Sequence, residues 1–284
     1  MRAHVPGTGH GARLAAMSES PIGIIGGSGL YSLLTDPEPV EVETPFGFPS
    51  ERPQRGTFGG KDVVFLPRHG ADHRLPPHRI NYRANLWALR ALGVRRVLAP
   101  SAVGGLLPEL APGSVVVPDQ LIDRTWGRHH TVYDEVGPVV HVGFADPYCP
   151  TGRATALEVD APSALTMVDG GTMVVIQGPR FSTRAESRRN AQDGGTVVGM
   201  TGAPEASIAR ELALCFTSLA LVTDSDAGVD AATAVSHAAV LEAFAANVGH
   251  VGTLLASVVA ALPDDADCSC RHALDGLTLP FELP

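Results

Sequence analysis

The sequence predicts an α/β fold made of a single domain, in which helices flank a central mixed β-sheet. Short continuous apolar runs recur along the chain, as expected for strands that are covered on both faces. Stretches with helical spacing of apolar residues separate these runs, which is the pattern of a layered α/β protein. The chain has 284 residues and only 18% of them are charged, so it can bury the core that such a fold needs.

The strands are expected where the apolar runs are short and continuous. These runs are 22–25, 63–66, 96–99, 114–117, 172–176, 197–198 and 216–222.

Three helices are expected between and after these strands. The segment 80–93 places apolar residues at helical spacing, and Gly93 can end the helix. The segment 203–214 carries Pro204 in its first turn, where proline is tolerated. A long apolar stripe up to 262 follows Ser236, which is a ready N-cap. The weakly patterned segment 152–163 is expected to form a short helix or a loop.

The composition argues against several classes of protein. The formal net charge of −9 disfavours a nucleic-acid surface, because such surfaces need clustered Lys and Arg. The four cysteines form no dense framework, so a reduced cytoplasmic protein is expected. No apolar run is expected to reach transmembrane length. Residues 1–20 are polar and glycine-rich and are expected to be a disordered extension, which leaves 21–284 as the domain.

A glycine-rich segment, "GIIGGSGL" at 23–30, overlaps the first expected strand and continues beyond it. Glycines let the backbone approach an anion, and the Ser28 hydroxyl with freed N–H groups can hold phosphate oxygens. The spacing does not match a dinucleotide-binding G-x-G-x-x-G fingerprint, and no Gly-Lys-Ser/Thr of a P-loop follows. A tight turn that needs small residues explains the segment equally well.

Polar side chains follow three other expected strands. Arg68 and His69 stand in "LPRHG", Ser101 in "SAVGGL", and Thr201 in "GMTGAPEA". Ligands of open α/β sheets bind beyond the carboxyl ends of strands. Arg has a planar fork that suits phosphate, and His adds a donor. Each segment taken alone is also explained by a surface ion pair or an ordinary turn.

Two further segments carry residues that could bind a part of the ligand other than its phosphate. In "QGPRFSTRAES", Phe181 is either a core residue or a platform for a flat ring, while Arg184 and Glu186 could form an ion pair. Asp224 and Asp226 end the last apolar run, where they could cap a helix or face solvent. A divalent metal is not favoured there, because no third carboxylate or His cluster with ligand spacing accompanies them.

Taken together, these motifs resemble the trimeric purine nucleoside phosphorylase superfamily, and most closely its 5′-methylthioadenosine phosphorylase branch. The resemblance covers 22 to 262, in the order "GIIGGSGL", "TPFG", "LPRHG", "NYRANLWAL", "SAVGGL", "PDQLIDRT", "DPYCP", "GPRFSTRAES" and "MTGAPEA". It implies a purine/uridine phosphorylase-like fold, a homotrimer, and reversible cleavage of a purine nucleoside by inorganic phosphate as co-substrate. It implies no cofactor and no metal, and no nucleic-acid or membrane partner is expected.

The resemblance also implies roles for single residues. The implied phosphate cradle consists of Ser28, Arg68, His69, Ser101, Ala102 and Thr201. Phe181 would pack on the purine and Met200 against the ribose. The implied pocket for the 5′ group is formed by Val235, His237, Val240 and Leu241. His141 would reach into the active site of the neighbouring subunit.

At the base, the resemblance implies that a neutral Asp224 protonates N7 of the leaving purine, with Asp226 and Ser182 beside it. The unperturbed pKa of Asp is about 3.9, and burial beside a second carboxylate would raise it. An ionised carboxylate accepts from a 6-amino group and repels a 6-oxo group, so 5′-methylthioadenosine is the expected substrate. Gly199 departs from the Asn that the family often has there, which keeps a 6-oxopurine nucleoside or methylthioinosine phosphorylase as the alternative.

Two other classes of protein compete with this interpretation. A Rossmann-type NAD enzyme predicts a G-x-G-x-x-G spacing that the sequence lacks. A nucleoside-binding protein without catalysis would be favoured if Arg68, His69 or Asp224 were missing, and all three are present.

The cysteines near the C-terminus carry one more resemblance. The motif "CSC", from Cys268 to Cys270, is similar to a C-x-C near the C-terminus of some heat-stable relatives. Free thiols are the expectation for these two residues and for Cys149 and Cys215.

Overall fold

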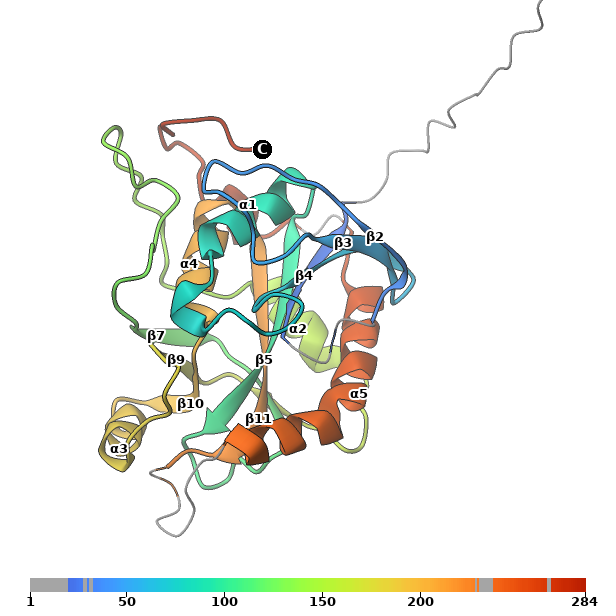
Figure 1. The fold of residues 1–284 in the computed structure, drawn as a ribbon, viewed down its shortest axis with the longest axis vertical. Coiled ribbons are helices and arrows are strands. Elements are labelled where there is room, and N and C mark those ends of the chain that lie inside the picture. Colours follow the sequence, from blue (N-terminus) through green and yellow to red (C-terminus); the bar gives the residue numbers. More distant parts are fainter. Residues whose placement is uncertain (1–19, 28–29, 31–32, 228, 230–236, 265–266) are drawn as a thin grey trace, which may run out of the picture.

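The computed structural model describes residues 20–27, 30, 33–227, 229, 237–264 and 267–284, and Figure 1 shows their arrangement. The expectation of a disordered extension at 1–20 falls, except for Ser20, outside the described residues.

The described elements alternate between strands and helices. The strands are β1 (Ile22–Gly26), β2 (Thr35–Pro39), β3 (Gln54–Phe58), β4 (Lys61–Pro67), β5 (Arg96–Gly105), β6 (Ser114–Val117), β7 (Gln120–Arg124), β8 (Thr166–Asp169), β9 (Thr172–Ile176), β10 (Gly195–Gly199) and β11 (Cys215–Ser225). The helices are α1 (Tyr82–Ala91), α2 (Pro150–Glu158), α3 (Arg184–Gln192), α4 (Gly202–Glu211) and α5 (His237–Ala261). Two short 3₁₀ turns are η1 (Pro77–Arg79) and η2 (Ser269–His272).

All the described strands belong to one mixed sheet, which confirms the predicted fold class. The main order is β2-β3-β4-β1-β5-β10-β9-β7, and a branch adds β11 beside β5, then β6 and β8. Strands β4, β1, β5 and β11 lie side by side and run parallel to one another, so their carboxyl ends meet at one edge of the sheet.

Helices cover both faces of this sheet (Figure 1). On one face, Leu86 of α1 and Ile208 of α4 pack in a buried cluster with strand residues such as Val64. On the other face, Leu254 and Val258 of α5 pack in a second cluster. Full burial of such side chains contributes about 1.5–3 kcal/mol each, so the two layers hold the sheet in place.

Local signals explain where two of the helices begin and end. The Asn81 side chain accepts from the backbone N–H of Ala84 and caps α1, and Gly93 supplies a φ of +87° just after its end. Thr183 and Glu186 form a capping box at the start of α3. Glu186 also binds Arg180 at 2.7 Å, so the expected pairing with Arg184 is not its main contact.

One helix overturns an expectation about apolar length. Residues Glu242–Ala261 of α5, with a mean hydropathy of 1.5, are long and apolar enough to cross a membrane by length and composition alone. Core helices of globular proteins pass the same test. One face of α5, with Val251, Leu254 and Leu255, packs into the core cluster against the sheet, and 33% of this apolar segment is buried.

Candidate active site

A gap beside β5 creates the site. On one side, β5 pairs with β11 along its whole length. On the other side, β1 covers only Arg96–Leu98, and β10 reaches only Gly104 and Gly105. Among the described strands, none pairs with 99–103 on that side, and Ala102 is exposed in the middle of the sheet. Ligands of open α/β sheets bind where neighbouring strands separate in this way.

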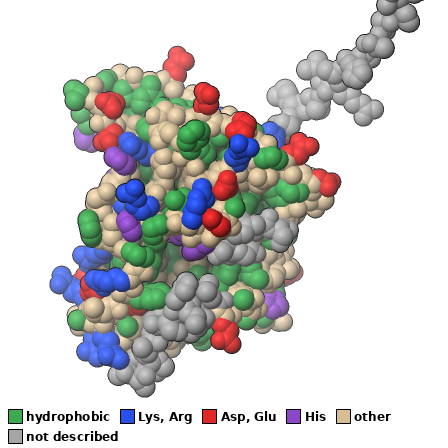
Figure 2. Space-filling model, in the orientation of Figure 1, with side chains coloured by type: hydrophobic (Ala, Val, Ile, Leu, Met, Phe, Trp, Pro, Cys, Tyr) green, Lys and Arg blue, Asp and Glu red, His purple; other side chains and the backbone are tan. Residues whose placement is uncertain are grey.

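A cavity of about 420 Å³ opens over this gap. Figure 2 shows a hollow near the middle of the face in view, with hydrophobic side chains around it. The volume lies within the range of roughly 300–1,000 Å³ that is usual for small-molecule sites. The cavity brings together these predicted residues: Arg68, His69, Ser101, Ala102, Phe181, Ser182, Met200, Thr201, Asp224, Asp226 and Val240.

Arg68 forms the cationic end of the cavity, but most N–H groups of its guanidinium already donate to acceptors of the protein. Nε and Nη2 donate to the two carboxylate oxygens of Glu205 at 2.8 and 3.0 Å. Nη2 also donates to the carbonyl of Ile25 at 2.9 Å, and Nη1 to that of Pro100 at 3.2 Å. Of the five N–H groups of an Arg, one on Nη1 has no partner in the described part of the chain. Arg68 can therefore offer phosphate a single hydrogen bond rather than the expected fork.

Glu205 is a site residue that the sequence analysis misses. It is buried in α4, where burial raises the pKa of its carboxyl while the Arg68 guanidinium opposes the rise. Removing one partner of a buried ion pair leaves an uncompensated charge and costs about 3–5 kcal/mol. Glu205 thus holds Arg68 in one position beside the cavity.

His69 uses one ring nitrogen to hold its own loop. Nδ1 lies 2.8 Å from the carbonyl oxygen of Leu75. A carbonyl only accepts, so Nδ1 carries a proton, and in the neutral ring Nε2 is left as an acceptor. Burial lowers the pKa of His69 to about 4, and the charge of Arg68 adds to this effect. In its neutral form His69 can accept from a protonated phosphate oxygen through Nε2, and a hydrogen bond donated by His69 to phosphate stays a prediction.

Backbone and hydroxyl groups complete this end of the cavity. The carbonyl of Pro100 faces the gap, where Arg68 binds it. Backbone groups alternate in direction along a strand, so the N–H of Ala102 faces the gap too. Since β10 is antiparallel to β5, the chain after it returns toward Ser101 and places Thr201 there. The Thr201 side chain makes no hydrogen bond that caps α4, which leaves its hydroxyl to a ligand.

A β-bulge shapes the opposite end of the cavity. The register of β11 and β5 shifts after Val222, so that Asp224 stands opposite Gly104. The extra residue is Thr223, whose hydroxyl lies 2.9 Å from Asp224 Oδ1 and 3.3 Å from the Val103 carbonyl. Bulges re-aim side chains next to active sites. Burial raises the pKa of Asp224, which the Thr223 hydroxyl opposes and the charge of Asp226 reinforces.

Two buried polar atoms at this end lack partners. Asp226 Oδ2 and Ser182 Oγ have no hydrogen-bond partner among the described residues. Nearly all buried polar atoms in proteins are satisfied. Because both residues line the cavity, the two atoms are available to a polar group of a ligand. Within the described residues, no third His, Cys or carboxylate joins the two aspartates to complete a metal site.

Strand β5 sets the distance between the two ends. Ser101 lies at the cationic end, and Gly104 lies opposite Asp224. A strand rises about 3.3 Å per residue, so the ends are about 10 Å apart. The walls between them include Phe181, Met200, Val240 and Phe244. The cavity therefore suits an elongated ligand with an anionic group at one end and a flat hydrogen-bonding ring at the other.

The remaining predicted residues are not placed in this cavity. Ser28 and Val235 lie outside the described residues, as do the side chains of His237 and Leu241. His141 is exposed in the loop between β7 and α2 and does not line the cavity of its own chain. Its reach into a neighbouring subunit stays a prediction.

Arg128 is a second residue that the sequence analysis misses. Its Nη1 donates to the carbonyls of Met200 and Ala203 at 3.0 and 2.6 Å, and its Nη2 donates to that of Gln177 at 2.8 Å. One buried side chain thus ties the segment after β9 to the segment after β10 and positions Met200. The surrounding sequence, "TWGRHH", is typical of an ordinary polar loop. The isolated Arg is therefore the only sequence signal for this role.

Comparisons with known proteins agree on one family. A family description, the phosphorylase superfamily, matches residues 21–261. The chain is 54% identical over 280 residues to the purine nucleoside phosphorylase of Streptomyces coelicolor, covering 95% of this chain and 100% of that protein. It is 53% identical over 266 residues to the S-methyl-5′-thioadenosine phosphorylase of Mycolicibacterium smegmatis, covering 93% and 99%.

A solved structure shares both fold and sequence. It is a variant of the adenosine/methylthioadenosine phosphorylase of Schistosoma mansoni in complex with methylthioadenosine, which matches with a TM-score of 0.78 and 38% identity. The match covers 84% of this chain and 90% of that one.

Proposed function

The chain belongs to the phosphorylase superfamily, and on this premise we propose that it cleaves 5′-methylthioadenosine with inorganic phosphate. The reaction is reversible and yields adenine and 5-methylthioribose-1-phosphate, which makes the enzyme a pentosyltransferase of purine and methionine salvage. Support comes from a relative named S-methyl-5′-thioadenosine phosphorylase at 53% identity and from the methylthioadenosine held by a related structure.

The observation that carries this substrate is the carboxylate end of the cavity. Asp224 has a raised pKa, so it can hold a proton that a leaving purine needs at N7. Asp226 Oδ2 lacks a partner among the described residues and can accept from an exocyclic 6-amino group. A 6-oxo group would meet that oxygen as a second acceptor. The pair therefore favours adenine over hypoxanthine or guanine.

The cationic end holds the phosphate. Ser101, Thr201, the N–H of Ala102 and the remaining N–H of Arg68 surround the oxygens, and His69 Nε2 accepts from the protonated one. This leaves an unprotonated oxygen for attack on C1′. Holding nucleophile and sugar together in one orientation supplies a large part of the rate enhancement.

The chemical step joins the two ends of the cavity. A phosphate oxygen forms a bond to C1′ as the bond from C1′ to N9 breaks through an oxocarbenium-like state. Charge that develops on the purine is neutralised by the Asp224 proton, and this electrostatic stabilisation acts in a site shielded from water. Asp224 regains a proton while the monoester releases that of hydrogen phosphate, so the overall reaction conserves protons.

A 6-oxopurine nucleoside phosphorylase is the second candidate. One relative at 54% identity is named purine nucleoside phosphorylase, and Gly199 departs from the Asn that the resemblance leads one to expect. Asp224 favours the 6-amino substrate over this alternative.

Assembly and cofactor use complete the proposal. The active form is a homotrimer in which His141 of one subunit completes the site of the next. The loop of His141 also carries Val136 and Val139, two strongly exposed apolar side chains that an interface would cover. Phosphate is the only co-substrate and no cofactor is used. The cytoplasmic location, expected from the cysteine pattern, stays a prediction.

The test is release of free base from four nucleosides, measured side by side with and without phosphate. Methylthioadenosine, adenosine, methylthioinosine and inosine vary the 5′ group and the 6 position independently. We expect phosphate-dependent release with the highest kcat/KM for methylthioadenosine. A higher value for inosine would select the second candidate, and release without phosphate would contradict phosphorolysis.

A further inference from the structure

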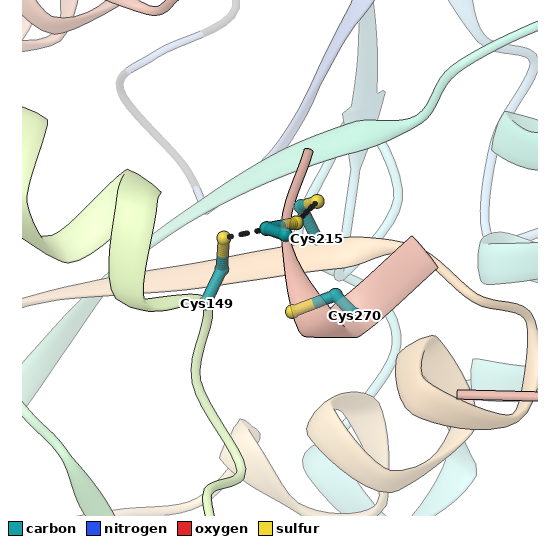
Figure 3. Close-up of side chains that lie close together, drawn as sticks. Cys149, Cys215 and Cys270 are labelled. Carbon is teal, nitrogen blue, oxygen red and sulfur yellow. Dashed lines mark hydrogen bonds between the residues drawn. The ribbon is translucent and has the colours of Figure 1, made fainter. Parts of the chain in front are cut away.

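Four cysteine side chains meet at the end of β11 that is remote from the active site. Cys149 precedes α2, Cys215 begins β11, Cys268 directly precedes the C-terminal turn η2, and Cys270 lies within that turn. Their sulfur atoms all lie within 4.8 Å of one another, and all four residues are buried. Figure 3 shows the labelled side chains coming together from separate segments. Every cysteine of the chain belongs to this cluster.

The spacing of the sulfur atoms is close to that of a tetrahedral metal site. With a Zn–S distance of about 2.3 Å, neighbouring sulfur atoms lie about 3.8 Å apart. Cys149 Sγ and Cys268 Sγ are 4.0 Å apart. Cys215 Sγ and Cys268 Sγ are closer, at 2.9 Å, and a shift of about 1 Å in one of them would reach the zinc value.

The surroundings of the sulfur atoms suit negative charge. The backbone N–H of Gly152 donates to Cys149 Sγ at 3.4 Å, and Arg210 Nη2 lies 3.9 Å from Cys270 Sγ. Metal-bound ligands are held by such outer hydrogen bonds. Four neutral thiols packed as small apolar groups would require neither donor.

Arg210 gives an independent indication of an anion at this place. It is buried, and its Nη groups donate to the carbonyls of Gly143 and Asp146. No carboxylate of the described residues lies within ion-pair distance of it. Buried charges in proteins are paired. A zinc ion with four thiolates carries two negative charges and would supply the missing partner.

We propose that Cys149, Cys215, Cys268 and Cys270 bind one zinc ion as a tetrahedral tetrathiolate. The protein fills all the coordination positions, which is typical of a structural site. The ion would fasten the C-terminal segment and the start of α2 to β11. Cys215 and Asp224 are nine residues apart on one strand, about 30 Å, so the ion takes no part in the phosphorolysis. The site departs from the expectation of free thiols and no metal.

The first experiment uses the full chain, expressed with zinc in the medium and purified without chelator. We expect about one zinc per chain by elemental analysis, and X-ray absorption at the zinc edge should show sulfur neighbours alone at about 2.3 Å. Titration with an organomercurial reagent should release the zinc in step with modification of the thiols.

The second experiment compares Cys268→Ser with Ser269→Ala as a matched control in the same turn. Ser269 is exposed and has no thiol. Cys268→Ser should lose its zinc on dialysis against a chelator and melt at a lower temperature, with an unchanged KM for nucleoside. Ser269→Ala should keep zinc and melting temperature. If Cys268→Ser does not fold, the measurements on the unmodified chain decide.

Three results would overturn the site. The chain could contain four titratable thiols and no zinc after purification. It could lack free thiols and have a mass reduced by the hydrogens lost in disulfide formation, which requires an external oxidant. Finally, Cys268→Ser could retain its zinc as firmly as the unmodified chain.

Discussion

Asp224 obtains its chemistry from burial at the end of a bulged strand. Replacement by Asn keeps the size of the side chain and removes the acidic proton. We expect Asp224→Asn to lower kcat/KM for methylthioadenosine by roughly 10²–10⁴-fold, the usual share of general acid catalysis. Cleavage of inosine should fall much less, because the Asn amide can donate to a 6-oxo group. Equal losses for both nucleosides would contradict a role in reading the base.

The hydroxyl of Thr223 holds the pKa of Asp224 down. Thr223→Val preserves the shape and removes the donor, so the pKa of Asp224 should rise further and the neutral acid should persist to higher pH. The basic limb of the pH profile of kcat/KM for methylthioadenosine should therefore move to higher pH. Thr223→Ser keeps the hydroxyl and should leave the limb in place. A limb that does not move in either variant would belong to another group.

His69 should make stability depend on pH. Its pKa is lowered from 6.5 to about 4 in the folded chain. Between pH 4 and pH 6.5, this residue is therefore mostly protonated in the unfolded chain and mostly neutral in the folded chain. The contribution of His69 to the free energy of unfolding is therefore fully present above pH 6.5. It decreases by up to about 3 kcal/mol as the pH falls toward 4. Chemical denaturation across this range should show the loss in the parent and a smaller one in His69→Gln. The exposed His78 serves as control, and an equal slope in His69→Gln would refute the assignment.

Single residues of the site were predictable only where a topological rule applies to them. Arg68, Ser101 and Asp224 follow apolar runs, and parallel strands bring their carboxyl ends to one edge. The partner of Arg68 was not predictable, because Glu205 lies 137 residues further along the chain in a segment that only indicates a helix. The Leu75 carbonyl determines that Nδ1 of His69 carries a proton, and no sequence pattern reveals this contact.

Among the elements, the strands at the edges of the sheet were not predicted from the sequence. β2, β3, β7 and β8 were not expected, and β2, β7 and β8 lie at ends of the sheet. Edge strands tolerate proline and charge because one side faces no partner. β2, with the sequence TDPEP, is exposed throughout and has no apolar pattern to detect. The buried strands β6 and β9 were predicted to the residue.

β5 was predicted to end at Ala99 and continues to Gly105. Pro100 and the glycines suggest a turn, but β11 runs beside the strand and supplies its hydrogen bonds. Local sequence could not show this support, because the partner strand lies more than a hundred residues away.

Gly104 and Gly105 provide a matched pair of tests on this strand. A Cβ on Gly104 would lie 3.3 Å from Asp226 Cβ and 3.4 Å from Asp224 Oδ2. A Cβ on Gly105 would meet Leu110 instead. We expect Gly104→Ala to raise KM for nucleoside several-fold while KM for phosphate stays near its parent value. Gly105→Ala should affect melting temperature rather than either KM. A rise in phosphate KM alone for Gly104→Ala would show that the base lies elsewhere.

For the whole molecule, the trimer can be tested by complementation. His141→Ala chains should lack the group supplied to the neighbour, and Asp224→Asn chains should lack the acid. When the two chains are co-expressed and assemble together, some sites combine an intact Asp224 with an intact neighbouring His141. Activity should then exceed the sum of the separate variants, and light scattering should give the mass of three chains. Simple additivity would mean that His141 does not act between subunits.

The pairing of Arg68 with Glu205 should affect turnover. Together the two side chains carry no net charge, so the empty site attracts phosphate through short-range hydrogen bonds rather than a strong field. Capture of phosphate should accordingly depend weakly on ionic strength. The phosphorylated sugar, which carries the same anionic group, is then not trapped by excess positive charge. A balanced site of this kind should therefore release the anionic product readily, whichever direction the reaction takes.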